Sequence, residues 1–310
     1  MKYGSFPCGF PCGGLTLKKE GKDMKKVLLA SSILALSAGV AAAEISFSGS
    51  AVMGLGDDGS AGGVRSIMET YLTAKASGET ETGLAFGFET TIATYDTDGG
   101  LNDDGTSVFI SGAFGKLSMG SVAEADEVAT LADIGGLSGL GVDNVAERFT
   151  GDSDDRQSHD VNYTYSGGAL TASLSAHIGA AGEGDGYAAG VKYAFGDAYV
   201  GLGYNDDNIA AATVTSVYAG GTFGTFGVAA MWSQFNPDAA GASLDAWGVH
   251  ASYTADALTL TAEVADNDLA SDTAYGIGAA YDLGGGASVV GGVANVEDET
   301  VWEAGFSFSF

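Results

Sequence analysis

Cysteine, proline and positive charge are all scarce in this 310-residue chain. The only two cysteines, Cys8 and Cys12, lie near its start, so the rest must be stabilised by sheet and core rather than by disulfides. Twelve Lys and Arg stand against 40 Asp and Glu, a formal net charge of −28, and such an acidic surface repels nucleic-acid phosphates. The chain has 50 glycines but only three prolines, too few for a collagen-like helix. Its hydrophobic residues make up 45% of the sequence, too many for a disordered chain.

Long hydrophobic runs are also lacking, except at residues 24–43. Lys25 and Lys26 precede a short apolar core there, and Ala41-Ala42-Ala43 supplies the small residues of a cleavage site. We predict a signal peptide over 24–43, a mature chain over 44–310, and an upstream extension over 1–23 that comes from a mistaken start. The mature chain then carries 38 acidic and six basic side chains.

Beyond residue 43 the hydrophobic pattern has a period of two residues, as in Ile45, Phe47, Met53 and Leu55, and no segment of helical length has apolar residues at helical spacing. An even number of alternating segments of about ten residues is typical of barrels that cross an outer membrane. We count sixteen, near 44–55, 64–76, 82–95, 106–113, 115–122, 158–166, 168–178, 186–196, 197–205, 213–223, 225–235, 245–254, 256–266, 273–282, 286–296 and 300–310.

The connections between these segments are alternately short and long. Gly167-Gly168 and Gly196-Asp197 represent the short set, and the acidic stretch 266–272 represents the long set. This sorting is typical of an up-and-down barrel, and a sandwich with Greek-key crossovers would not produce it. One connection, 123–157, is much longer than the others and contains no predicted strand, so we expect it to have a function.

Charged residues within the predicted strands lie on the face opposite the aliphatic and aromatic residues. A charge on the lipid face near mid-membrane costs about 2–4 kcal/mol, so this pattern indicates a barrel that is apolar outside and polar inside. The predicted lumen-wall residues are Arg65, Glu69, Lys75, Glu89, Lys116, Lys192, Glu263 and Glu303.

Two stretches, TSVFISGAFGKLSMG at 106–120 and YDLGGGASVVGGVAN at 281–295, resemble the Rhodobacter-type bacterial porins, as do YVGLGY at 199–204 and the carboxy-terminal Phe310. The likeness runs through 44–310. It implies an all-β fold, a sixteen-stranded antiparallel transmembrane β-barrel that forms homotrimers in the Gram-negative outer membrane. It further implies a passive water-filled channel for ions and small hydrophilic solutes, without enzymatic activity, whose long third loop folds into the lumen.

The long connection 123–157 matches that third loop by position and length. Its predicted pore-constriction residues are Glu124, Asp126, Glu127, Asp133, Asp143, Glu147 and Arg148. Constrictions in the family often oppose basic wall residues to acidic loop residues, and a chain with six cations departs from that arrangement. Because carboxylates in a pore enrich cations, we expect the channel to prefer cations.

A competing hypothesis is an outer-membrane β-barrel hydrolase with an active site at the rim around His159. This histidine lies beside Asp154, Asp155 and Asp160 in the sequence. Catalysis would need a nucleophile or a paired carboxylate within hydrogen-bond reach, and no G-x-S-x-G motif is present. The sequence therefore favours a solvated histidine at the rim of a barrel.

Two acidic clusters could bind Ca²⁺, which prefers several oxygen ligands. The candidate ligands are Asp96 and Asp98 in one loop and Asp266 and Asp268 in another. Neither cluster continues as an EF-hand, so solvated loop charge or divalent bridging to lipopolysaccharide are the alternatives. No other cofactor is expected, because the G-x-G-x-x-G pattern at Gly54–Gly59 is followed by a strand and not by the helix that a dinucleotide site needs.

Overall fold

The computed structural model describes residues 44–95, 100–150, 159–179, 185–207, 211–239 and 241–310. The predicted signal peptide and the upstream extension lie outside these residues. The described chain forms sixteen strands and one short helix, α1 (Val142–Ala146). The strands are β1 (Glu44–Asp57), β2 (Arg65–Glu79), β3 (Ala85–Thr94), β4 (Asn102–Gly112), β5 (Gly115–Gly120), β6 (Val161–Gly167), β7 (Leu170–His177), β8 (Gly186–Phe195), β9 (Ala198–Asp207), β10 (Ala212–Phe223), β11 (Phe226–Pro237), β12 (Leu244–Ala255), β13 (Leu258–Asn267), β14 (Ala274–Gly284), β15 (Ala287–Val296) and β16 (Glu299–Ser309).

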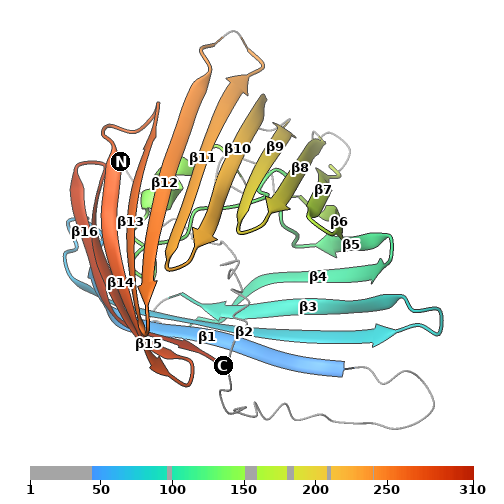
Figure 1. The fold of residues 1–310 in the computed structure, drawn as a ribbon, viewed down its shortest axis with the longest axis horizontal. Coiled ribbons are helices and arrows are strands. Elements are labelled where there is room, and N and C mark those ends of the chain that lie inside the picture. Colours follow the sequence, from blue (N-terminus) through green and yellow to red (C-terminus); the bar gives the residue numbers. More distant parts are fainter. Residues whose placement is uncertain (1–43, 96–99, 151–158, 180–184, 208–210, 240) are drawn as a thin grey trace.

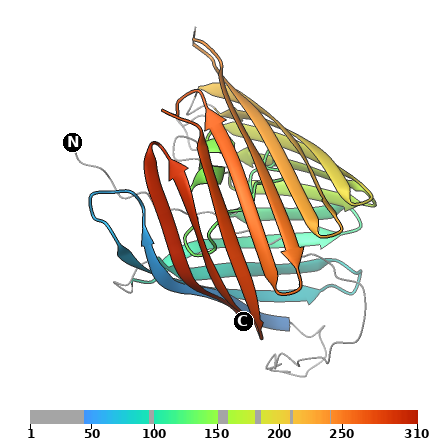
Figure 2. The same cartoon turned by 60° about the vertical axis from the view of Figure 1, so that its left-hand side comes forward.

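Each strand pairs antiparallel with its neighbours in sequence, and β1 pairs with β16 to close a barrel (Figures 1 and 2). The closing seam runs from Ser50 opposite Ser309 to Asp57 opposite Trp302. Beyond the seam, the Phe310 amide donates to the Gly49 carbonyl at 2.9 Å. Closure gives every strand two partners, which removes the unpaired edges of an open sheet.

The predicted alternation of short and long connections is present in the fold except between β15 and β16, where the predicted long connection has only two residues, Glu297 and Asp298. Connections of two residues join β4 to β5, β6 to β7, β8 to β9 and β10 to β11, all at one end of the barrel. Gly196 and Gly224 occupy left-handed conformations in two of these turns, which suits glycine because it has no Cβ. The longest connection lies between β5 and β6, at the other end, and it contains α1.

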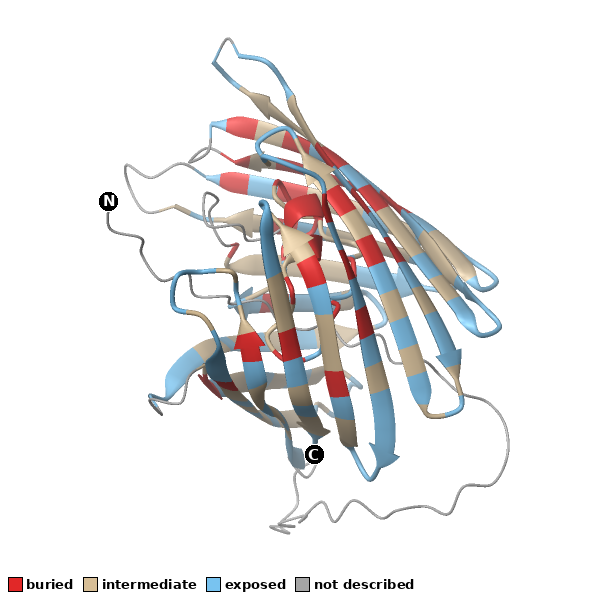
Figure 3. Ribbon diagram, turned by 90° about the vertical axis from the view of Figure 1, so that its left-hand side faces the viewer, coloured by how far each residue is buried: buried red, intermediate tan, exposed pale blue. Residues whose placement is uncertain are grey.

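Side chains alternate between the two faces of the wall, as Figure 3 shows by its bands of buried and exposed residues. The exposed face carries most of the large apolar side chains, among them Phe47, Leu174 and Ile277. Aromatic residues recur on this face six residues apart, about 20 Å along a strand, as girdles at the two boundaries of an apolar band do. Such pairs are Tyr187 and Tyr193, Phe226 and Trp232, Trp247 and Tyr253, and Tyr275 and Tyr281.

All sixteen predicted segments are strands, and their ends differ from prediction by at most four residues. The largest difference is at β4, which begins at Asn102 instead of near 106. The polar residues there still pair with β3, because a bulge between Thr90 and Ile92 keeps the two backbones in register. No helix among the described residues is long and apolar enough to cross a membrane.

Candidate functional site

The strand register places all eight predicted wall charges on the inner face. Cross-strand partners share a face, and the exposed apolar side chains mark the other face as the outer one. Gly56, for example, is opposite Arg65 on β2 and opposite Glu303 on β16. Four of the eight are basic and four acidic, so their formal charges cancel.

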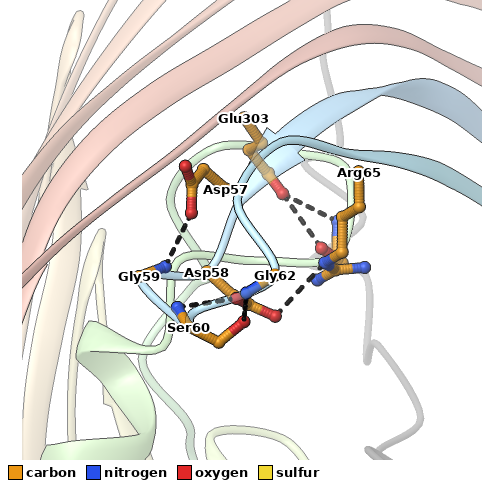
Figure 4. A network of polar contacts seen from close by, with 8 residues as sticks. Asp57, Asp58, Gly59, Ser60, Gly62, Arg65 and Glu303 are labelled. Carbon is orange, nitrogen blue, oxygen red and sulfur yellow. Dashed lines mark hydrogen bonds and ion pairs between the residues drawn. The ribbon is translucent and has the colours of Figure 1, made fainter.

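Two of the basic wall residues form ion pairs. Arg65 Nε lies 3.3 Å from an oxygen of Asp58 in the β1–β2 turn, and Lys75 Nζ lies 3.6 Å from an oxygen of Glu89. Hydrogen bonds from Ser60 and the charge of Arg65 lower the pKa of Asp58, so this turn stays ionised. Figure 4 shows the turn with Glu303 beside it.

The chain between β5 and β6 first crosses the inner wall over β7, β8 and β9, where glycines leave room for its backbone. A Cβ added at Gly190 would lie 1.8 Å from the Ala125 carbonyl oxygen, and one at Gly203 would lie 2.1 Å from that of Asp126. The Ala125 amide donates to Ser175 Oγ at 2.8 Å. The backbone of 125–126 therefore lies directly on the wall.

Further along, Glu303 holds the turn at 135–138. Its carboxylate accepts hydrogen bonds from the Leu137 amide at 2.7 Å, the Ser138 amide at 3.0 Å and the Ser138 hydroxyl at 3.1 Å. The Glu303 side chain is only 2% exposed, so these bonds replace water around a buried charge. Glu303 is thus a residue of the lumen wall, as predicted, but its carboxylate anchors the long connection.

The helix α1 and the residues before it pack against inward-facing side chains of the wall. The Val145 carbonyl accepts from Asn267 Nδ2 at 2.8 Å, and Gly248 leaves space for Ala146 and Leu131. Together they form a buried apolar cluster. Its buried members are Leu131, Ile134, Leu140, Val142, Val145, Ala146, Tyr218, Met231, Ala265, Ala274 and Ala294.

Three of the predicted constriction residues, Glu124, Asp126 and Asp143, are buried. Asn205 on β9 donates to Glu124 at 2.7 Å and to Asp126 at 3.1 Å, so these two carboxylates face the wall. Asp133 is exposed, whereas Glu127, Glu147 and Arg148 are partly exposed. A contribution to the open constriction stays a prediction for those four.

Burial, followed by the nearby charge of Asp143, raises the pKa of Glu147 to about 9. Its carboxyl accepts a hydrogen bond of 2.6 Å from the Leu131 amide. Burial also raises the pKa of Asp143. The long connection thus carries less negative charge near neutral pH than its sequence suggests.

His159 is 3% exposed, which corrects the expectation of a solvated rim histidine. Its Nδ1 lies 2.6 Å from Ser175 Oγ, the same oxygen that accepts from the Ala125 amide. The crossing of residues 125–126 covers this part of the wall, so the pair lies in the attachment of the long connection. A hydrolytic site at the rim would need this serine to be open to substrate.

The described residues contain no group of three or more His, Cys, Asp or Glu side chains placed to hold a metal ion. Asp266 accepts a hydrogen bond from Thr273 at 2.7 Å, and Asp268 accepts one from the Asp245 amide at 2.9 Å. Asp96 and Asp98 lie outside the described residues.

Sequence reasoning did not identify the wall residues that receive the long connection. Gly190 and Gly203, together with Ser175 and Asn205, lie on the inner face of neighbouring strands. Glycines at inward positions of adjacent strands could have indicated where the long connection lies on the wall, because a glycine within a strand often marks the close approach of another backbone.

The comparisons with known proteins agree with this architecture. The family model described as Gram-negative porin matches residues 30–300. This chain belongs to that family. A porin from Rhodobacter capsulatus is 31% identical over 312 residues, covering 86% of this chain and all of the relative. A porin structure refined at 1.8 Å has 29% identity and a TM-score of 0.67, and a mutant of the Rh. blastica porin has 23% identity and a TM-score of 0.70. The match to each structure covers the whole of that structure and 86% of this chain.

Membership makes this protein an outer-membrane β-barrel that acts as a passive diffusion channel for Gram-negative transport. Porins are not enzymes, so the hydrolase hypothesis is wrong. The hydrogen bond between His159 and Ser175 is then structural, and the lumen is the functional site.

Proposed function

We propose that this porin prefers cations and that its two mouths produce the preference. The supporting observation is the placement of charge, because the eight wall charges cancel while the connections are acidic. In the described parts of the long connections, Arg148 is the single basic residue. Acidic residues there include Asp58, Asp160, Asp185, Asp238, Asp268 and Asp272, and the shorter turns add Glu81, Asp197, Asp256, Glu297 and Asp298.

Such an excess of carboxylates produces a potential of several kT at low salt, which enriches cations at the entrances. Reversal potentials in a KCl gradient at neutral pH test the proposal. We expect cation selectivity near 0.1 M salt, a decline above about 1 M, where the Debye length is roughly 3 Å, and a further decline near pH 4 as carboxylates protonate. Anion selectivity at low salt would refute it.

The segment 123–157 sets the width of the channel in this proposal. Support comes from its attachments to the inner wall, among them those at Ser175, Glu303 and Asn267. Deleting about 15 residues around 135–144 should raise single-channel conductance while the barrel keeps its β-sheet circular dichroism. An unchanged conductance in a folded deletion variant would contradict this role.

A homotrimer is also proposed, with contacts through the outer face of β1–β5. Among the described residues, no Tyr or Trp lies on that face, whereas β6, β8, β11, β12 and β14 carry exposed Tyr or Trp side chains. Thr90 and Thr106 instead join their hydroxyls there at 2.7 Å. Light scattering of the detergent-solubilised protein should give three copies, and Thr90→Trp should reduce the trimer fraction, whereas Val249→Trp on the girdled face should not.

We further propose export through a signal peptide at 24–43 and contact of the acidic loops with lipopolysaccharide through divalent cations. The support for export is the apolar core followed by Ala41-Ala42-Ala43. Mass spectrometry of the exported protein should find Glu44 as its first residue. Chelation of divalent cations should release bound lipopolysaccharide from the purified porin.

A further inference from the structure

Two lysines of the inner wall, Lys116 and Lys192, differ from the other cations of the wall. Arg65 and Lys75 are held by Asp58 and Glu89, but no described carboxylate lies within ion-pair distance of Lys116 or Lys192. Each ammonium lies over an aromatic ring, Lys116 Nζ at 4.9 Å from the centroid of Phe109 and Lys192 Nζ at 5.3 Å from that of Tyr199. Lys75 Nζ also lies 5.5 Å from the Phe109 centroid, so the difference between these lysines is the carboxylate of Glu89, which pairs with Lys75. A ring face attracts the ammonium but leaves its N–H donors available for another partner.

The wall between these two lysines is lined with hydroxyl groups. Lys116 is opposite Thr164 on β6, and Lys192 is opposite Thr171 on β7. Ser173 lies between, 3.0 Å from Thr164 Oγ1, and Ser166 lies 3.4 Å from Thr171 Oγ1. The two lysines lie on β5 and β8, which are three strands apart, or about 14 Å across the strands of the wall. Hydroxyl groups line the wall between them.

This strip, defined by Lys116, Thr164, Ser166, Thr171, Ser173 and Lys192, lies directly next to the crossing of the long connection. Asn162, one inward position before Thr164, donates to the Ala123 carbonyl at 2.8 Å, and Ala125 lies on Gly190, one inward position before Lys192. The strip therefore begins at the crossing and extends toward the short turns of β4–β5 and β8–β9.

We propose that the strip is a binding site for small hydroxylated anions such as sugar phosphates. The lysine ammonium groups attract a phosphate and donate hydrogen bonds to its oxygens. The Ser and Thr hydroxyls can donate hydrogen bonds to the hydroxyls of a sugar and accept hydrogen bonds from them. Between the acidic mouths the strip offers anions a local site. Its binding is weak, because a solute that is held tightly does not leave the pore.

Ion-current measurements with glucose 6-phosphate test this site in the purified, full-length porin in planar bilayers. In 0.1 M KCl, the solute added on the short-turn side should reduce the current in a saturable way. The double substitution Lys116→Met and Lys192→Met keeps the alkyl stems and should raise the half-blocking concentration at least tenfold. Lys75→Met, which removes a lysine already paired with Glu89, is the matched control and should change it less than twofold.

A second pair of variants tests recognition of the hydroxyls. Thr164→Val with Thr171→Val should weaken the block by glucose 6-phosphate at least threefold and leave the block by inorganic phosphate unchanged. Equal effects of Lys75→Met and the double lysine variant would overturn the proposal, since general electrostatics would then explain the block. An unchanged block in either double variant would also overturn it. These results do not depend on the cation preference proposed above, which the reversal potential tests separately.

Discussion

Replacing Glu303 tests how the long connection is held inside the barrel. The carboxylate accepts three hydrogen bonds from Leu137 and Ser138 and is almost completely buried. A hydrogen bond to a charged group contributes about 1.5–3 kcal/mol, and bonds that share one carboxylate are less than additive. We therefore expect Glu303→Ala to weaken the docking of 135–138 by about 3–5 kcal/mol.

That loss corresponds to roughly a 10²- to 4 × 10³-fold larger population of the undocked segment, because each 1.4 kcal/mol is tenfold. Amide hydrogen exchange of the peptide that covers 131–140 measures the change directly. Exchange there should accelerate by the same factor, while peptides of β10 and β11 exchange as before. Single-channel recordings should show added current noise from movement of the segment.

Glu303→Gln separates charge from contact, because the amide keeps one oxygen that can accept. It should accelerate exchange less than Glu303→Ala does. Glu89→Gln is the control, since it removes an inner-wall carboxylate that pairs with Lys75. If a folded Glu303→Ala variant exchanged over 131–140 at the wild-type rate, the assignment of Glu303 as the anchor would be wrong.

Three further predictions concern the wall, the long connection and the membrane. Gly190→Ala should displace residues 125–126, because its Cβ would overlap the Ala125 carbonyl, and hydrogen exchange of that segment should rise while Gly196→Ala leaves it unchanged. The raised pKa of Glu147 means that the docked segment binds a proton that the released segment lacks, so docking should be strongest below about pH 4.5 and weaken until about pH 9. Because the pKa of Asp143 is raised as well, Glu147→Gln should reduce this pH dependence of exchange without abolishing it, and a pH dependence equal to that of the wild type would exclude Glu147 as a cause. Trp247→Ala should reduce stability in lipid vesicles by about 1–3 kcal/mol by urea unfolding, since it removes a girdle ring that is exposed outside the barrel.

The strands could be predicted from the sequence because one physical constraint governs every position in them. Lipid on one side and water on the other impose a two-residue period, and residues such as Leu174 and Ser175 display it directly. The same alternation predicted that the charged side chains within the strands lie on the inner face.

The path of the long connection could not be predicted, because its residues have no such period. Glu124 and Asp126 look like exposed loop acids in the sequence, and only the contact with Asn205 reveals that they face the wall. His159 was misjudged for the same reason, since the residues that cover it are distant in the sequence. Anchoring by Glu303 joins positions 165 and 166 residues apart, which local pattern reading does not detect.

The seam between β1 and β16 makes the folding of this barrel dependent on its final residues. Gly49 and Phe310 exchange backbone hydrogen bonds, so the last contact to close the wall joins the two ends of the described chain. A contact between residues so distant in sequence carries a large loop-closure cost and forms late. Until then β1 and β16 are open edges that can pair with other chains. Removing the last few residues should therefore reduce the yield of assembled barrels and increase aggregation, even though those residues lie far from the narrow part of the channel.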